Sequence, residues 1–544
     1  MKKINIWVTA LCIAVVMLQS CKKEFLDEDL KSSYSPENTL TDSLGLEAAM
    51  AGLQNVVRGQ YTTSTAQGLL TTMQIGTDVA RHGLSTTEMT GFYDYPQLNS
   101  QNPAISFLWT NAYQIINNAN LIIKAADNPA VPLSKVGRDG FSAEARFFRA
   151  YAYNFLSTLW GDVPLVDQPL DKPRTDFTRA PVNDILNFMI ADLTFSATNL
   201  PEVTKVKREG RINKAAAQHL LAEVYLRANK PDLAEQQCKN IIAGNAFKLI
   251  TARYGVKKDQ PGDAFADMFI KGNQRRREGN TEGIWIIEQE YNLPGGTTAT
   301  REFTAADQHH RVWVPFYSNI AGMVVADSLG GRGIGRLRLS NFVLYGLYKG
   351  NDIRNSVYNI KRKFYYNDPN PKSAAKLGKP VLVGPPPLGI AATDTIHRIA
   401  PHTTKWNYFN PLQDGTAFAS FKDLIMMRLG ETYLLMAEAQ LMQGKLPEAA
   451  ASINVLRTRA QAAQVQASDI TLDFILDERV RELIAEENRR MTLARTKTLV
   501  NRVQTRNAAN ITGLQSFNML LPLPQSEINL NNGAVLTQNP GYAN

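Results

Sequence analysis

The stretch LLAEVYLRANKPDLA, residues Leu220–Ala234, is matched at a constant offset by LMAEAQLMQGKLPEA, residues Leu435–Ala449. The identical pairs are Leu220/Leu435, Ala222/Ala437, Glu223/Glu438, Leu226/Leu441, Lys230/Lys445 and Ala234/Ala449. Apolar residues of the first stretch recur at the spacing of one helix face. Each stretch therefore predicts a helix, a tight turn at Asn229 or Gly444, and a second helix that begins near a proline.

Small alanines in these stretches allow the two helices of each hairpin to pack closely. The pattern resembles the tetratricopeptide repeat, in which helix pairs stack into a superhelix. The consensus tyrosine is present as Tyr225 and is replaced by Gln440. Segments around Trp109–Ala125 and Ala143–Trp160 are candidates for further pairs. We therefore predict a mostly α fold, built on a tetratricopeptide-like helical-repeat scaffold.

The middle of the chain has a different composition, because it is rich in glycine, proline and aromatic residues. It holds short strand-like runs, among them GIWIIEQEY (Gly283–Tyr291) and VWVPFY (Val312–Tyr317). We predict a loop-rich insertion with short strands, packed on the helices within one domain. The predicted boundaries are helical parts at about 40–246 and 422–510, the insertion at about 247–421, and an extended C-terminal tail at 511–544.

The segment ERVRELIAEENRR, Glu478–Arg490, has charged residues around an apolar stripe. The stripe consists of Leu476, Val480, Leu483 and Ile484. Charges on the rest of such a helix are expected to face water. Glu486 and Arg490, four residues apart, are therefore predicted to form a surface ion pair.

Composition and motifs argue against several classes of protein. With 44% hydrophobic and 20% charged residues, the chain is typical of a globular protein. The formal net charge is +9, but the basic clusters Lys205–Arg208 and Arg275–Arg277 are short and lack interleaved aromatic residues, so we expect no nucleic-acid partner. Serine-hydrolase elbow, zinc-protease helix and phosphate-loop motifs are absent. We expect neither catalysis nor a cofactor.

The N-terminal segment predicts export and anchoring. Lys2 and Lys3 precede an apolar run, Ile6–Leu18, that is too short to span a bilayer. The run ends in Leu-Gln-Ser-Cys21, which resembles the lipobox of bacterial lipoproteins. We predict a signal peptide at 1–20, lipidation of Cys21 and a tether at 21–39. The other cysteine of the mature chain, Cys238, is then free and lies at a buried helical position, so no internal disulfide is expected.

Several longer blocks resemble one family. They are FLD after Cys21, AEARFFRAYAYNFLSTLWGDVPLV (143–166), MMRLGETYLLMAEAQLMQGKLPEAAASINVLRTRA (426–460), ILDERVRELIAEENRRMTLAR (475–495) and LLPLPQSEINLNNGAVLTQNPGY (520–542). In this order they resemble the SusD/RagB family of Bacteroidetes outer-membrane lipoproteins. The resemblance implies four tetratricopeptide-like units under a variable ligand face. It also implies a surface-exposed protein that binds a nutrient, usually a glycan, and partners a SusC-type TonB-dependent transporter.

Glycan binding requires flat aromatic faces beside amide, carboxylate or guanidinium groups. Two stretches outside the repeats supply that mixture, Thr77–Asn102 and Asp307–Asn319. The family places ligand contacts in the loop after the first helix and in the central insertion, which are the same two places. The predicted ligand-binding residues are Asp78, Arg81, Phe92, Tyr93, Tyr95, Asn99, Trp313 and Tyr317.

Other aromatic and histidine residues are assigned to the interior. Trp109, Trp160 and Trp285 are expected in the core, and His309-His310 beside Asp307 is not expected to bind a metal. Three alternatives to glycan capture stay open: a surface glycoside-processing enzyme, a peptide-binding RagB-like protein, and a scaffold that only holds partner proteins. The acidic run after Cys21 resembles a surface-export signal, which favours display on the cell surface.

Overall fold

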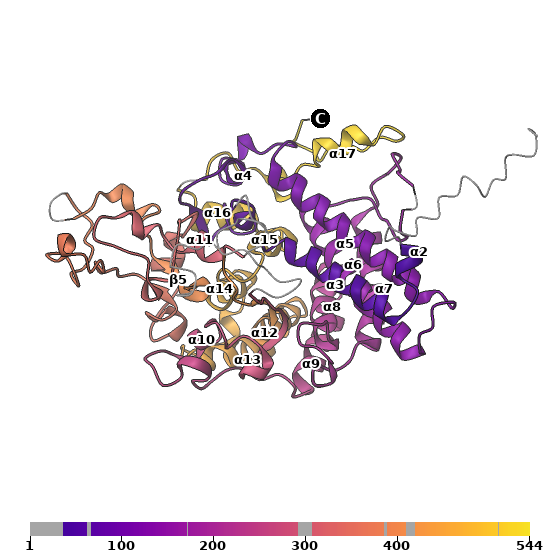
Figure 1. The fold of residues 1–544 in the computed structure, drawn as a ribbon, viewed down its shortest axis with the longest axis horizontal. Coiled ribbons are helices and arrows are strands. Elements are labelled where there is room, and N and C mark those ends of the chain that lie inside the picture. The colour runs from indigo at the N-terminus through magenta and orange to yellow at the C-terminus, as the bar shows by residue number, and fades with distance from the viewer. Residues whose placement is uncertain are drawn as a thin grey trace, which may run out of the picture.

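Helices from both halves of the chain form the body of the protein, and the irregular middle segment extends from one side of it (Figure 1). The computed structural model describes residues 36–62, 67–170, 172–291, 307–385, 389–409, 419–509 and 511–543. Cys21, the predicted signal peptide and most of the predicted tether lie outside these ranges. None of the helices in the described ranges is both long and apolar enough to cross a membrane.

The N-terminal helices pack in chain order. They are α3 (Ser43–Gly59), α5 (Pro103–Asp127), α6 (Lys135–Leu159), α7 (Val182–Asn199), α8 (Lys214–Arg227) and α9 (Pro231–Ala243), with the short α2 (Pro36–Thr39) and α4 (Thr87–Thr90). Helix α3 packs on α5, and from α5 to α9 each helix packs against the next one. The row then continues directly from α9 to α12, although about 190 residues separate them in the chain. The C-terminal helices are α12 (Leu429–Met442), α13 (Leu446–Arg459), α14 (Leu472–Leu483), α15 (Arg489–Arg495), α16 (Leu499–Arg506) and α17 (Gln525–Leu530).

The two repeat hairpins form as predicted, and the mostly α, helical-repeat fold is confirmed. Asn229 and Gly444 both adopt positive φ, 55° and 72°, which turns the chain between the helices. At the interface between the hairpins, the Gln440 side chain donates to Glu235 Oε1 over 3.2 Å and accepts from the Ser452 hydroxyl over 2.7 Å. The replacement of the consensus tyrosine at this position therefore supplies a buried polar contact between repeats.

The described part of the middle segment has little regular structure. Its helices are α10 (Ala264–Asp267) and α11 (His309–Trp313), and three antiparallel strand pairs lie within it or join it to the rest: β1 (Ala80–His82) with β3 (Leu337–Leu339), β2 (Gly283–Ile287) with β6 (Leu424–Arg428), and β4 (Ile360–Lys361) with β5 (His402–Thr403). The predicted strand at Gly283 is confirmed. The strand predicted over Val312–Tyr317 is wrong, because its first two residues end α11 and Pro315 cannot donate to a strand ladder.

The predicted solvated face of the Glu478–Arg490 segment is also wrong. Its apolar stripe is buried as expected, but Glu482 is also fully buried, because the middle segment and β6 cover this side of α14. Arg490 of α15 is fully buried as well, because it packs against the loop after α3, where its Nη2 donates to the Tyr95 hydroxyl over 2.7 Å. Glu486 does not pair with Arg490. It pairs instead with Lys405 and with Arg428, whose Nε lies 2.7 Å from a Glu486 oxygen.

The predicted core residues lie in the interior. Trp109, Trp160 and Trp285 are at most 4% exposed, and Cys238 is completely buried on α9. Trp160 Nε1 donates to the Pro522 carbonyl over 2.8 Å, so the core tryptophan also holds the C-terminal segment on the body.

The hairpin turn at Gly444 provides a clean test of backbone conformation. A Cβ added to Gly444 would meet no atom within 4 Å, and the same is true of Gly52 inside α3. Gly444→Ala should lower the free energy of unfolding by about 1–2 kcal/mol, because an L-residue is strained at positive φ. Gly52→Ala should raise it by roughly 0.5–1 kcal/mol, because alanine is the better helix former. Urea unfolding measures both, and a stabilising Gly444→Ala would contradict the assigned turn.

Candidate functional site

The loop between α3 and α5 and the middle segment meet through the β1–β3 strand pair. Ala80, Arg81 and His82 pair with Leu339, Arg338 and Leu337. This pairing joins residues about 257 positions apart, and it places the loop Thr77–Asn102 against the middle segment. The two regions in which ligand residues were predicted are therefore neighbours in the fold.

Most of the predicted ligand-binding side chains are buried. Asp78, Phe92, Tyr95, Trp313 and Tyr317 are all at most 3% exposed. Their polar atoms already bind protein groups: the Tyr95 hydroxyl donates to the Gly76 carbonyl over 3.2 Å, and the Tyr317 hydroxyl donates to the Gly331 carbonyl over 2.6 Å. These side chains support the loops rather than face solvent.

Asp78 anchors the base of the loop to the C-terminal helices. Its carboxylate accepts from Arg489 Nε over 2.8 Å and from Arg502 Nε over 2.9 Å. Burial alone would favour the neutral acid, but the two guanidinium groups outweigh burial and hold the pKa of Asp78 below its ordinary value. The ionised carboxylate therefore acts as a structural clamp.

A second group of predicted residues does reach the surface. Arg81 and Tyr93 are partly exposed and Asn99 is exposed. The Tyr93 ring stacks on the His82 ring, with centroids 4.1 Å apart and planes 20° from parallel, and its hydroxyl lies 2.7 Å from the Ser85 hydroxyl. We call Arg81, His82, Tyr93 and Arg338 the loop face. The stacking of His82 was not predicted, since a sequence does not show which ring lies on which.

An open depression of about 750 Å³ lies beside Tyr93. It also includes Gln97, Asn99 and Gln101, whose amides can donate and accept hydrogen bonds. Tyr93 and Asn99, two of the predicted residues, thus share one surface. An aromatic edge next to several amides is the mixture that sugar hydroxyls and ring C–H groups require.

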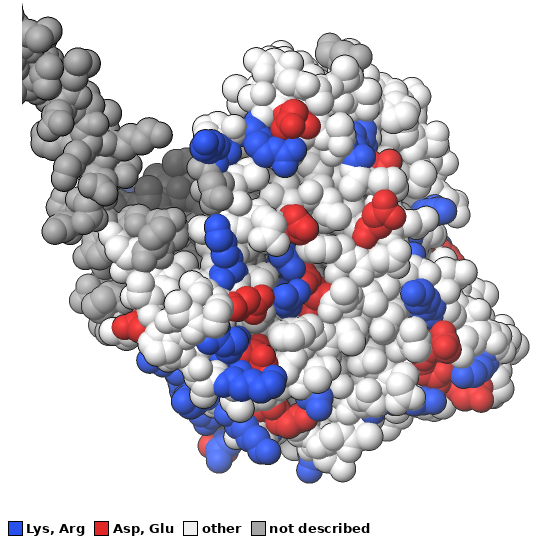
Figure 2. Space-filling model, turned by 90° about the vertical axis from the view of Figure 1, so that its right-hand side faces the viewer, with Lys and Arg blue, Asp and Glu red and all other residues white. Residues whose placement is uncertain are grey.

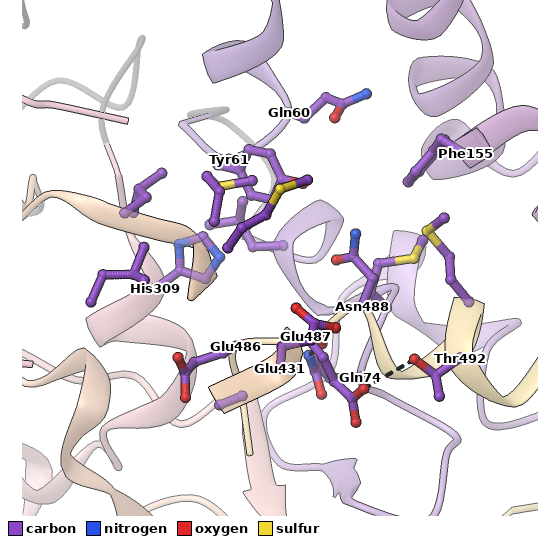
Figure 3. A pocket seen from close by; sticks show the side chains of 18 of the residues that line it. Gln60, Tyr61, Gln74, Phe155, His309, Glu431, Glu486, Glu487, Asn488 and Thr492 are labelled. Atoms are coloured by element: carbon purple, nitrogen blue, oxygen red, sulfur yellow. Dashed lines mark hydrogen bonds between the residues drawn. The ribbon is translucent and has the colours of Figure 1, made fainter. Parts of the chain in front are cut away.

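A separate, more enclosed cavity of about 140 Å³ lies where the N-terminal helices, the C-terminal helices and the middle segment meet (Figure 3). Gln60 and Tyr61 lie on one side of it, and Glu431, Glu487 and Thr492 lie on the other. Its aromatic walls are formed by Tyr61, Tyr151, Phe155, Trp285, Trp313 and Trp406. Trp313, predicted to bind ligand, belongs to this central cavity and is not part of the loop face.

Two acids of the central cavity, Glu431 and Glu487, share one arginine. Arg479 donates to Glu431 over 2.6 Å and to Glu487 over 2.8 Å. Burial opposes ionisation of Glu431, but Arg479 and His219 outweigh it and keep the pKa of Glu431 well below its ordinary value. The Glu431 carboxylate is therefore suited to accept hydrogen bonds and is a poor proton donor.

Within the ranges that the structure describes, no three histidine, cysteine or acidic side chains gather as a metal site would require. His309 Nδ1 lies 2.5 Å from an Asp307 oxygen, and its ring stacks on Trp406 at 4.1 Å. Burial lowers the pKa of the neighbouring His310 to about 3, despite the attraction of Asp307. Both histidines are accounted for by packing.

Comparisons with known proteins identify the family. Residues 346–542 match the family model described as "SusD family", and residues 24–226 match the one described as "Starch-binding associating with outer membrane". The chain belongs to the SusD-like family. SusD-like protein P25 of Formosa agariphila is 24% identical over 95% of this chain and 96% of its own length. A SusD-like protein of Bacteroides ovatus is 29% identical over 50% of this chain and 48% of its own length.

Solved structures share the fold of this SusD-like chain. A laminarin-binding SusD-like protein superimposes with a TM-score of 0.69 at 20% identity, over 92% of this chain and 99% of that protein. Surface glycan-binding protein A from Bacteroides thetaiotaomicron superimposes with a TM-score of 0.70 at 18% identity, over 92% and 100%. At these identities the likeness concerns the fold alone.

The buried position of Asp78 leads to a stability test. Asp78→Asn should lower the free energy of unfolding at pH 7 by about 3–5 kcal/mol, because it leaves Arg489 and Arg502 without their shared buried partner. The folded-state pKa of Asp78 lies below its unfolded value, so its contribution is present above about pH 4 and is lost as the pH falls through the folded-state pKa.

Chemical unfolding at pH 7 and at pH 3 measures this difference, with Asn99→Ala as the surface control. The gap between wild type and Asp78→Asn should narrow at pH 3. A fully stable Asp78→Asn protein would return Asp78 to the list of ligand-binding candidates.

Proposed function

We propose that this SusD-like protein captures a glycan on the loop face and passes it to a TonB-dependent transporter in the outer membrane. The observation that carries the proposal is the stacked His82–Tyr93 pair beside a depression that contains Asn99. The names of its relatives support it, since they include a laminarin-binding protein and surface glycan-binding proteins. The family description also refers to starch binding and outer-membrane association.

The geometry suits a weak, open binding site. The Tyr93 ring offers an apolar surface for the C–H side of one sugar ring, and its stacking on His82 limits rotation of both rings. The neighbouring amides of Gln97, Asn99 and Gln101 can bind hydroxyl groups of the next ring. An open depression of this kind can accommodate an internal stretch of a polymer, which agrees with capture of a long nutrient chain before transport.

Lipidation at Cys21 would keep the binding domain beside its transporter. We propose that residues 21–39 tether a ligand-binding domain, residues 40–544, to the outer surface of the outer membrane. A lipid anchor confines the protein to two dimensions, so encounters with a membrane-embedded partner depend on surface density rather than on bulk concentration. The acidic residues that follow Cys21 are consistent with surface display.

We further infer that binding is not coupled to cleavage of the glycan. Glycosidases use two carboxylates that flank the scissile bond, one of which must be protonated. No acid belongs to the loop face as defined, and Arg479 and His219 hold the pKa of Glu431 in the central cavity well below its ordinary value, so that this carboxylate is ionised. Release of reducing sugar from any bound glycan by the purified protein would overturn this inference.

Removal of the aromatic platform tests the proposed site. Tyr93→Ala should weaken binding of a captured glycan at least about tenfold, because one stacking contact contributes on the order of 1–3 kcal/mol. Calorimetry against a panel that includes laminarin and soluble starch measures the loss. Tyr358→Ala removes a more exposed tyrosine, 40%, that is not part of the loop face, and it should leave affinity unchanged. Equal affinities for wild type and Tyr93→Ala on every bound glycan would rule out the loop face.

The anchor has its own test. Cys21→Ser, expressed in a Bacteroidetes host, should shift the protein from the membrane fraction to the soluble fraction, because serine lacks the thiol that accepts the lipid. A control, Cys238→Ser, changes a cysteine that is buried in the body and should leave the protein in the membrane fraction. Retention of Cys21→Ser in the membrane would show that another feature anchors the chain.

A further inference from the structure

Two arginines of the loop face lie directly opposite each other. Arg81 of β1 and Arg338 of β3 are register partners in the antiparallel pair. Side chains of directly opposite residues project from the same face of a pair, with Cβ atoms about 4.5–5.5 Å apart. Like charges in this arrangement destabilise the pairing unless something between them compensates.

No described side chain supplies that compensation. Neither guanidinium forms an ion pair with a carboxylate in the described ranges, whereas Arg354, Arg428 and Arg459 in the interior each bind at least two. Arg81 Nη2 donates to the Ala509 carbonyl over 3.1 Å, and Arg338 Nε has no hydrogen-bond partner. Both side chains are partly exposed, so an anion from solution can reach them.

The pKa of His82 is consistent with the same excess of positive charge. Burial lowers the pKa of His82, and the charges of Arg81 and Arg338 lower it further. No carboxylate of the described residues offsets the effect of the two arginines on this pKa. His82 is therefore neutral at pH 7, and it supports the Tyr93 ring without adding a third positive charge.

At least one other face of the protein does not share this imbalance. On the face that includes the N-terminal helices, basic and acidic side chains alternate (Figure 2). Arg174, for example, lies 2.9 Å from Asp176, and Lys135 pairs with Asp139 one helix turn away. Opposed arginines that form no ion pair thus distinguish the loop face from this other face.

We propose that the ligand of the loop face is an acidic glycan, whose sulfate or carboxylate group binds between Arg81 and Arg338 while an adjacent sugar ring packs on Tyr93. The planar guanidinium fork matches both anions through paired N–H donors. Binding of the anion would remove the repulsion across β1 and β3, so part of the affinity comes from relief of an existing cost. This inference rests on the proposed function and specifies its substrate class.

The test compares polymers that differ in charge only. The full chain in detergent is titrated, by calorimetry or affinity electrophoresis, with dextran sulfate against dextran and with polygalacturonate against its methyl ester. The acidic polymer that carries the correct anion should bind at least tenfold more tightly than its neutral counterpart at low salt. This difference in affinity should decrease as the salt concentration is raised. A preference within the dextran pair indicates a sulfated ligand, and a preference within the polygalacturonate pair indicates a uronate ligand.

Variants locate the effect. The double variant Arg81→Gln/Arg338→Gln should lose at least tenfold in affinity for the preferred acidic polymer and little for its neutral counterpart. Arg174→Gln/Arg208→Gln removes the same charge from exposed positions outside the loop face and should change neither affinity. Circular dichroism and the melting temperature verify that both double variants are folded.

The possible failures are distinguishable. If neutral and acidic polymers bind equally and Tyr93→Ala weakens both, the acidic class is wrong while glycan capture on the loop face stands. If both double variants weaken acidic binding equally, the preference is a property of net charge, and the assignment to Arg81 and Arg338 is overturned. If none of these polymers, laminarin or starch binds, the proposed function fails as well.

Discussion

The fold depends on a group of charges that are buried together at the centre of the molecule. Glu482 of α14 accepts hydrogen bonds from Arg428 at the end of β6, from Arg459 at the end of α13 and from Arg354 of the middle segment. Glu282, next to β2, shares Arg428 and Arg459. Charges removed from water are tolerated only when every one is paired, and loss of one partner commonly costs about 3–5 kcal/mol. The group therefore requires that segments far apart in the chain be in place at once.

A second ionic clamp connects this interior to the proposed binding surface. Asp78 is held by Arg489 and Arg502, which lie seven and 20 residues after Glu482 in the chain. Arg81 and His82 follow Asp78 by only a few residues and emerge at the surface in β1. The loop is thus rigid at its base and presents its arginine and its aromatic stack from a fixed backbone. A preorganised site loses less conformational entropy when a flexible polymer binds.

The two hollows of the molecule differ in what they can do. The loop face is open, aromatic on one side and positively charged, which suits a polymer that passes across it. The central cavity is more enclosed, and two of its carboxylates, Glu431 and Glu487, are bound by Arg479. The central cavity lies between the N-terminal helices, the C-terminal helices and the middle segment, so it forms only when these three parts of the chain pack together.

Local features of the chain were readable from the sequence. The hairpins at Asn229 and Gly444 were predicted from the spacing of apolar residues and from turn residues that tolerate positive φ. Both features depend only on residues that are close together in the chain. The composition of the loop Thr77–Asn102 also predicted that it presents side chains to a ligand, and Arg81, Tyr93 and Asn99 do reach the surface. The burial of Asp78, Phe92 and Tyr95 could not be predicted from the sequence, because aromatic and polar residues occur both in the core of a loop and on a binding surface.

The sequence by itself determined the helical repeats and the family, because periodicity and turn chemistry are set by neighbours in the chain. Only the tertiary structure decided which charges are buried and which are presented. Glu482 and Arg81 are equally polar in the sequence. One is enclosed because the middle segment folds back over α14, and the other faces Arg338 because β1 pairs with a strand about 257 residues away. Solvation and charge pairing depend on those distant neighbours, and so does the chemistry of the site.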